Sequence, residues 1–265
     1  MNVSVVVEAL TTLPTGLILT ASLTISSLFL SFFISVPLAL LRTSANSAVS
    51  ATVLVYTYVF RGTPLLVQLF IIYYGVGQIA FIRQGFLWPV LREPFWCALM
   101  AFTLNSTAHT TEVFRGGIQA IPRGLNEAAK SLGLSRIQTF GLITFPLMMR
   151  ISLPAYTNEV IGMLKASSLA STITLLEITG LARKLVSATF APYEVFLVAG
   201  ALYLALTYAI ANLSARLERR WNRKIISADA GAAIAPSIAS SPVDHTRSTE
   251  RSDKHSIETT PRKGE

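Results

Sequence analysis

Long uncharged apolar runs alternate with short charged segments along most of the chain. The run 16–41 carries no charge and is closed by Arg42, and a second uncharged run fills 62–82. Because a helix of about 20 apolar residues crosses a bilayer, such runs predict membrane-spanning helices. The expected spans lie at about 16–41, 62–82, 94–114, 151–175 and 195–215. The fourth has the weakest pattern, since it contains Glu159 and Lys165.

Composition agrees with this pattern. The 265 residues are 52% hydrophobic and 14% charged, with a mean hydropathy of +0.54, whereas a soluble domain carries roughly a quarter charged residues. We therefore expect an all-α, polytopic helical bundle of about five spans in contact with membrane lipid. The net charge of +8 comes from basic residues beside apolar runs, which indicates membrane topology and not nucleic-acid binding.

Other classes of site find little support in the residue types. Cys97 is the lone cysteine and the three histidines are far apart in sequence, so no disulfide framework, metal site or cofactor is predicted. The N-terminus is not typical of a cleaved signal peptide, because Glu8 comes early and no basic segment precedes the apolar run.

The distribution of basic residues predicts the orientation. With the N-terminus outside, the outer side keeps four basic residues, Arg83, Arg92, Arg183 and Lys184. The cytoplasmic side then holds twelve, namely Arg42, Arg61, Arg115, Arg123, Lys130, Arg136, Arg150, Arg216, Arg219, Arg220, Arg223 and Lys224. We expect an outer N-terminus and a cytoplasmic C-terminus, which places the loop 116–150 in the cytoplasm.

The chain divides near residue 224. Residues 1–224 form the predicted membrane domain, and residues 225–265 contain no aromatic residue, many Ser, Thr and Ala, and five basic against six acidic residues. Such a segment cannot bury enough apolar surface to order itself. It is interpreted as a disordered cytoplasmic tail, either passive or carrying a function of its own.

A polar insert, "GLNEAAKSLGLSRIQTFGLITFP" at 124–146, separates two of the apolar runs. Pro122 suits the first turn of a helix, and Gly133 suits the left-handed conformation that ends one. Ser135 and Gln138 have the spacing of a capping box. The insert is therefore predicted to form a short helix, a break at Gly133 and a second helix that returns to the membrane.

The short helix has features of a docking element. Ala128 and Ala129 would give it a smooth face for close approach, and Glu127 adds one charge. Leu132 and Leu134 flank the break and are suited to fill a pocket on another protein. An ordinary amphipathic connector without a partner explains the same residues, so both interpretations stay open on physical grounds.

The insert resembles the EAA motif of ABC importer permeases. That motif has Glu-Ala-Ala, then Gly after three residues, then Ile after nine more, and ends in Pro. Here it occurs as "EAAKSLGLSRIQTFGLITFP" with complete spacing, and Phe145 replaces the more frequent Leu. The resemblance implies a type I ABC importer permease fold, in which the short helix is the coupling helix that docks on an ATP-binding subunit.

Two further stretches, "FRGTPLLVQLFIIYYG" (60–75) and "LPAYTNEVIGMLKASSLASTI" (153–173), resemble the polar amino acid uptake branch. The chain is most similar to the M-type permeases of histidine/lysine/arginine/ornithine and octopine or nopaline uptake, over about residues 13–224. "FLWPVL" (86–91) and "STITLLEITGLARKL" (171–185) favour the opine type. His109 stands where the branch commonly has Tyr.

The resemblance implies partners and a location. It implies a second permease subunit, as a hetero pair, a periplasmic solute-binding protein and a separate ABC ATP-binding subunit, in the bacterial inner membrane. The chain has no G-x-x-x-x-G-K-[ST] phosphate loop, so it is not expected to be an enzyme. Its expected function is to form the pathway for polar, in particular basic, amino acids or opines and to couple through the EAA loop.

Ionisable residues within predicted spans are candidates for the translocation pathway. Glu159, with its neighbour Asn158, would stabilise a cationic or zwitterionic solute; its alternative role is to be neutralised within the bundle. Lys165 lies about 240° around the helix from Glu159, which argues against a direct pair and leaves a structural role equally open. Arg61, at the expected cytoplasmic end of the second span, is either a membrane anchor or part of a gate.

Three other polar features are predicted to be structural. Glu112 and Arg115 are three residues apart and can pair on one helix face. Gln68 and Asn105 lie within apolar runs and can hydrogen-bond between helices. His109 is expected to face the bundle and bond a backbone carbonyl, with a titrating gate as its alternative.

Two rival functions remain. A stand-alone secondary amino acid transporter is disfavoured by the small number of spans and by the absence of an internal repeat. A membrane receptor or assembly protein would place its signal in the tail 225–265.

Overall fold

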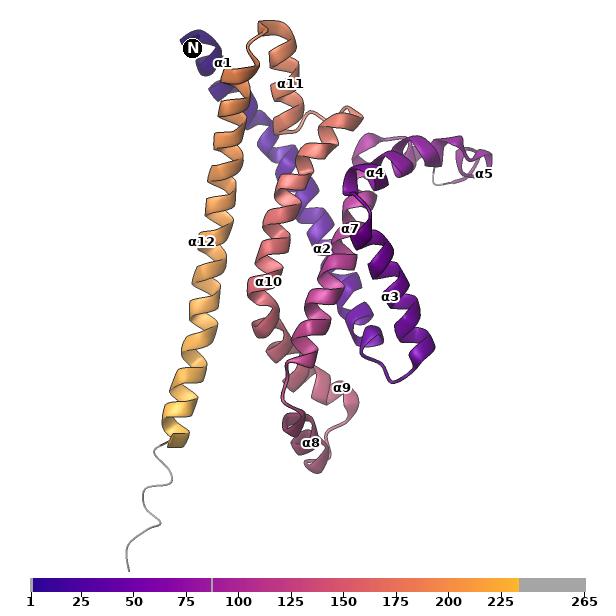
Figure 1. Cartoon of the computed structure of the whole chain (residues 1–265), viewed down its shortest axis with the longest axis vertical. Coiled ribbons are helices and arrows are strands. Elements are labelled where there is room, and N and C mark those ends of the chain that lie inside the picture. The colour runs from indigo at the N-terminus through magenta and orange to yellow at the C-terminus, as the bar shows by residue number, and fades with distance from the viewer. Residues whose placement is uncertain (1, 87, 234–265) are drawn as a thin grey trace, which may run out of the picture. The chain divides into compact units, whose positions relative to one another are not determined.

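The computed structural model describes residues 2–86 and 88–233, and every regular element in them is a helix. Residues 1–222 form one compact unit, shown in Figure 1. Its first half contains α1 (Val3–Thr12), η1 (Leu13–Gly16), α2 (Leu17–Arg42), α3 (Ser47–Gly62), α4 (Leu65–Phe70), η2 (Ile71–Gly75), η3 (Val76–Gln78), α5 (Ala80–Arg83) and α6 (Trp88–Leu91). The second half contains α7 (Pro94–Gln119), α8 (Arg123–Ser131), α9 (Arg136–Thr139), η4 (Phe140–Thr144), α10 (Phe145–Ala166), η5 (Ser167–Ile173), α11 (Ile178–Thr189) and most of α12 (Pro192–Ala233), which continues past residue 222.

Two stretches of the described residues are long and apolar enough to cross a membrane alone, Val3–Arg42 and Pro192–Arg220. They contain the predicted spans 16–41 and 195–215. Two bent helix pairs raise the number to as many as four if each pair is counted as one span. The predicted span 151–175 falls in one of them, where α10 and η5 are followed by α11 at a bend of 47°.

The prediction of one continuous span at 62–82 is wrong. A helix, α3, already occupies Ser47–Gly62, and the chain then bends by 100° before the segment Leu65–Gln78. Thr63 and Pro64 make the break: Thr63 ends α3 in an extended conformation, and Pro64 has ψ of 133°. Proline disfavours the helical conformation of the residue before it, so an apolar run that looks continuous in sequence is interrupted in space.

Helix α7 lies at the centre of the bundle and packs against α2, α3, α4 and α10. It has 26 residues, but its composition is not apolar enough for it to be a candidate membrane-spanning helix by itself. Its buried residues include Thr103, Ser106, Thr107 and Thr110. Because its neighbours, and not lipid, surround it, α7 does not need an apolar surface, and small residues allow the helices to approach closely.

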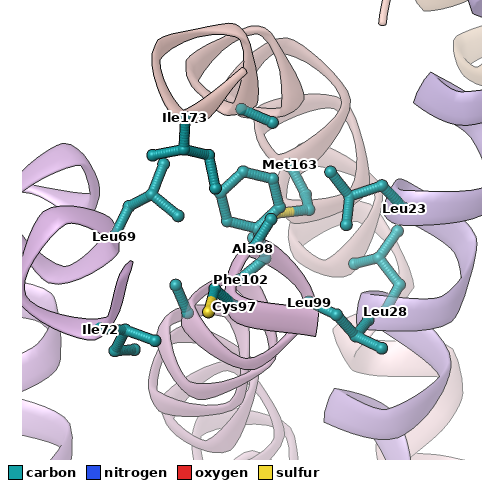
Figure 2. Packing of buried hydrophobic residues seen from close by; sticks show 12 residues of the cluster. Leu23, Leu28, Leu69, Ile72, Cys97, Ala98, Leu99, Phe102, Met163 and Ile173 are labelled. Carbon is teal, nitrogen blue, oxygen red and sulfur yellow. The ribbon is translucent and has the colours of Figure 1, made fainter. Parts of the chain in front are cut away.

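The main apolar cluster joins segments that are distant in sequence, with residues from α2, α4, η2, α7, α10 and η5. Figure 2 shows Cys97 and Phe102 of α7 between Leu23 of α2 and Leu69 of α4. Phe102 is fully buried, so it contributes through van der Waals packing between the helices. This cluster holds α4 against α7 after the 100° bend and so fixes the direction in which the broken helix continues.

A second cluster closes the end of the unit where the chain begins. Val5 and Leu13 pack there with Ile178 of α11 and Val195 of α12. Figure 1 shows α8 and α9 at the opposite end of the unit. The long helices therefore separate the N-terminal end from the polar insert.

The predicted tail overlaps the last helix. Helix α12 continues to Ala233, so the expectation of disorder from residue 225 is wrong for 225–233. Ala228, Ala230, Ala232 and Ala233 belong to this stretch, and alanine is the strongest helix former. The rest of the tail prediction, 234–265, lies outside the described residues.

Candidate functional site

The polar insert folds through local hydrogen bonds into the predicted helix, break and second helix. Helix α8 ends at Ser131, and Gly133 follows with a positive φ of 74°. The amide of Gly133 donates to the Lys130 carbonyl at 2.9 Å, and that of Leu134 donates to the Ala129 carbonyl at 3.0 Å. These two bonds form a Schellman motif, so the role assigned to Gly133 is confirmed.

The second helix begins with the predicted capping box. The backbone N–H of Gln138 donates to the Ser135 hydroxyl oxygen at 3.3 Å, and the backbone N–H of Ser135 donates to the Gln138 side-chain oxygen at 2.9 Å. Helix α9 leads through η4 into α10, with Pro146 in its first turn. At the other end of the insert, Pro122 is the N-cap of α8 and not its first helical residue, so its predicted place was off by one position.

Exposure separates the residues that were expected to form one docking face. Glu127 and Ala128 are exposed, and Leu132 is 79% exposed. Ala129 is buried at 1%, and Leu134 is half-buried. Ala128 and Ala129 therefore do not share a face, because successive residues lie about 100° apart around a helix.

Apolar side chains surround the exposed part of the insert. Leu125, Leu132, Ile137 and Leu142 are exposed there. A pocket of about 340 Å³ beside them is lined by residues of α2, α8, α9 and η4, namely Leu40, Asn126, Lys130, Leu134, Arg136, Thr139, Phe140 and Thr144. Exposed leucines next to charged residues are typical of a surface that a protein partner covers.

A second polar group lies within the bundle. The Nδ1 atom of His109 on α7 is 4.0 Å from a carboxylate oxygen of Glu159 on α10. Arg61, in the last turn of α3, is exposed, and its charge acts on both groups only at longer range. His109 therefore contacts a carboxylate, and not the backbone carbonyl expected from sequence.

Arg61 does not begin a second span, contrary to the prediction. It lies in the last turn of α3, 14 residues after Ser47, which corresponds to about 21 Å along a helix. The start of α3 is held beside the end of α2, where Arg42 donates to the Ser50 hydroxyl at 2.7 Å. Arg61 therefore lies at the other end of α3 from Arg42, with which it was grouped in the predicted orientation.

The remaining two candidates, Asn158 and Lys165, are both exposed on α10. Lys165 lines a pocket of about 320 Å³ with Thr179, Tyr203 and other residues of η5, α11 and α12. The structure thus brings Glu159 together with His109, leaves Arg61 exposed in the last turn of α3 and places Lys165 in a separate pocket.

An ion-pair network connects the helices between this group and the insert. Arg115 Nε lies 2.6 Å from Glu112, which confirms the predicted pair, and Arg42 Nε lies 3.5 Å from the same carboxylate. Thr57 of α3 donates to Glu112 at 3.4 Å. The participation of Arg42 and Thr57 was not predicted, since they belong to other helices and no local spacing relates them to Glu112.

Residues 31–223 match the family described as "Binding-protein-dependent transport system inner membrane component". The chain belongs to this family. It is accordingly an inner-membrane permease component of a binding-protein-dependent transport system.

Three relatives illustrate the similarity. The chain is 45% identical to the nopaline transport system permease protein NocM of Agrobacterium fabrum, over 80% of this chain and 89% of the relative. It is 46% identical to the octopine permease protein OccM of Rhizobium radiobacter, over 77% and 83%. The histidine/lysine/arginine/ornithine permease protein HisM of Salmonella typhimurium is 39% identical, over 80% and 91%.

Solved structures agree with the fold. The crystal structure of an amino acid ABC transporter with histidines has a TM-score of 0.70 and 32% identity, covering 81% of this chain and 96% of its own. An inward-facing structure of the MetNI methionine ABC transporter has a TM-score of 0.64 at 20% identity and shows the shared fold. These proteins are ABC transporter components, so the alternative function of this chain as a stand-alone secondary transporter is not supported.

Proposed function

We propose that this permease subunit carries polar, in particular basic, amino acids or opines across the membrane. The observation that carries the proposal is the carboxylate of Glu159 beside His109 within the bundle, with the exposed cation Arg61 at the end of α3. An amino acid presents a carboxylate and an ammonium group, which complement a guanidinium and a carboxylate. The names of the relatives, for nopaline, octopine and histidine/lysine/arginine/ornithine systems, support the same class of solute.

Glu159 would provide the attraction for the cationic part of the solute. Two unit charges 4 Å apart interact by about 4 kcal/mol at an effective dielectric constant of 20. Glu159 is mostly enclosed, with its side chain 18% exposed, so water would screen it less than at a free surface. Asn158 is exposed next to it, and its amide would add a neutral hydrogen-bonding group. Lys165 would belong to the rim of a separate pocket.

The insert would be the surface that couples transport to ATP hydrolysis in a separate ABC subunit. Glu127, Ala128 and Leu132 are exposed on α8 and its C-terminal turn and would contact the ATP-binding subunit. Ala129, Gly133 and Leu134 would hold that turn in shape. This division of roles refines the docking face expected from sequence.

The assembly would follow the orientation of the charges. The insert would face the cytoplasm and the N-terminus the periplasm, where a solute-binding protein delivers the solute. A second permease subunit, as a hetero pair, would complete the pathway beside the exposed Arg61.

The test measures uptake and ATP hydrolysis in a reconstituted importer that contains the ATP-binding subunit, the second permease and the binding protein. Glu159→Gln should reduce uptake of arginine and octopine while keeping ATP hydrolysis that responds to the binding protein. Glu127→Lys should release the ATP-binding subunit and abolish both activities, with the permease still present in the membrane.

Two results would overturn this proposal. Full uptake by Glu159→Gln would remove Glu159 from the pathway. Retention of the ATP-binding subunit and of uptake by Glu127→Lys would remove α8 from the coupling surface.

A further inference from the structure

The 100° break between α3 and α4 leaves backbone groups without helical partners. The carbonyls of Phe60 and Thr63 lie at the end of α3, where the next turn is missing and Pro64 has no N–H to donate. Within a membrane bundle, an unpaired backbone group costs several kcal/mol. The break therefore requires donors from side chains.

Two buried amides supply these donors. Gln68 Nε2 lies 2.8 Å from the Phe60 carbonyl oxygen, 3.1 Å from the Thr63 carbonyl oxygen and 2.7 Å from the Thr63 hydroxyl, and its two hydrogens are shared among these three acceptors. Asn105 Nδ2 of α7 lies within 3.2 Å of both the Phe60 carbonyl and the Gln68 side-chain oxygen. Gln68 is 6% exposed and Asn105 is 7% exposed, so water cannot readily replace either.

The amide pair holds the residue that precedes Arg61. Two donors converge on the Phe60 carbonyl, and Arg61 follows directly in the chain. On α7, Asn105 and His109 are four residues apart, which places them on the same helix face. One face of α7 therefore carries both the anchor of the break and the imidazole beside Glu159.

We infer that Gln68 and Asn105 form a clamp that positions Arg61 in the translocation pathway. The inference rests on the proposed pathway role of Arg61 and Glu159. Without the clamp, the last turn of α3 would be free to unwind, and Arg61, which follows Phe60 in that turn, would lose its fixed place. The clamp residues act through Arg61 and are not expected to touch the solute.

The experiment measures solute transported per ATP hydrolysed in the reconstituted importer. Gln68→Leu removes the amide donor at the break with little change in volume and should lower this ratio about tenfold, as expected for loss of hydrogen bonds to buried groups. ATP hydrolysis should stay within about twofold of the unmodified protein, because the clamp is not part of the coupling surface. The double exchange Gln68→Asn with Asn105→Gln retains two amides and should restore part of the ratio.

A double-mutant cycle with Arg61→Ala decides whether the clamp acts through Arg61. Non-additive losses in Gln68→Leu, Arg61→Ala and their combination are expected. Additive losses, or an unchanged ratio in Gln68→Leu, would overturn the clamp. If Arg61→Ala itself transported normally, the proposed pathway would fail instead.

A second variant covers the case in which Gln68→Leu does not accumulate in the membrane. Asn105→Ala removes one of the two donors to Phe60 and leaves the Gln68 amide donor at the break. It should lower the transport ratio by less than Gln68→Leu and again show no further loss with Arg61→Ala. A fall in transport and ATP hydrolysis to the same extent would identify a general structural defect and overturn the inference.

Discussion

Gly133 offers the sharpest test of the coupling element, because its conformation and its surroundings are both defined. It has φ of 74°, in the left-handed region, and a Cβ added there would meet no atom within 4 Å. A substitution would therefore strain the backbone without a steric clash in the chain itself. The left-handed conformation costs a residue with a side chain about 1–2 kcal/mol.

This cost is large for one turn. A change of one or two kcal/mol alters the ratio of two states by a factor of about 5–30. The turn that joins α8 to α9 would lose its two Schellman bonds in much of the population. Leu132, next to Gly133, would then no longer be presented in a fixed arrangement to the ATP-binding subunit.

Gly133→Val and Gly133→Asn form a matched pair of similar size. Valine is a genuine outlier in the left-handed region, whereas asparagine is several-fold enriched there. Uptake in reconstituted vesicles and co-purification of the ATP-binding subunit should both fall strongly for Val and little for Asn. The permease content of the membrane should be equal in the two, since Gly133 contributes no packing.

Two outcomes would refute this reasoning. Normal uptake by Gly133→Val would show that the turn geometry is not needed. Equal and severe loss in both variants would show that Gly133 leaves space for a close approach of the partner, and that the backbone conformation is not what limits coupling.

Three further predictions concern packing. Ala129→Asp should reduce the amount of permease in the membrane, because Ala129 is 1% exposed. Ala128→Asp should leave the amount unchanged and reduce uptake. Equal amounts of the two variants on immunoblots would contradict this prediction. Glu177 accepts hydrogen bonds from two backbone amides of α11 and from the Tyr203 hydroxyl. Glu177→Ala should therefore lower the free energy of unfolding of the permease by about 1–3 kcal/mol and Tyr203→Phe by about 1 kcal/mol, measured by thermal unfolding in detergent. A larger loss for Tyr203→Phe than for Glu177→Ala would contradict this prediction. Gly117→Ala should separate α7 from α10 and reduce uptake, since its Cβ would lie 3.1 Å from the Met148 carbonyl oxygen of α10. Wild-type uptake at equal abundance would show that the close approach of the two helices at Gly117 is not required.

The insert shows why some structure can be predicted from a single sequence. The Schellman turn at Gly133 and the capping box of Ser135 and Gln138 each involve residues a few positions apart. Their geometry depends on local backbone chemistry, so spacing alone defines it. The same holds for the spans near the two ends of the membrane domain, where an uncharged run of sufficient length requires no knowledge of its neighbours.

Burial within the bundle required the tertiary structure. Sequence suggested that Ala128 and Ala129 share a docking face, but Ala129 is turned into the protein. It likewise treated α7 as one more span, although its buried threonines and serines reflect a position among other helices. Periodicity identifies which residues share a face, and only packing determines what that face contacts.

By itself, the sequence determined the helical class, the membrane-spanning apolar runs and the local geometry of the coupling element. The tertiary structure alone decided that the chain turns by 100° after Gly62 and that His109 meets Glu159. These two residues come from different helices, and the donors that stabilise the turn come from two. Contacts between segments so distant in sequence arise from the packing of the whole bundle, which no local spacing encodes.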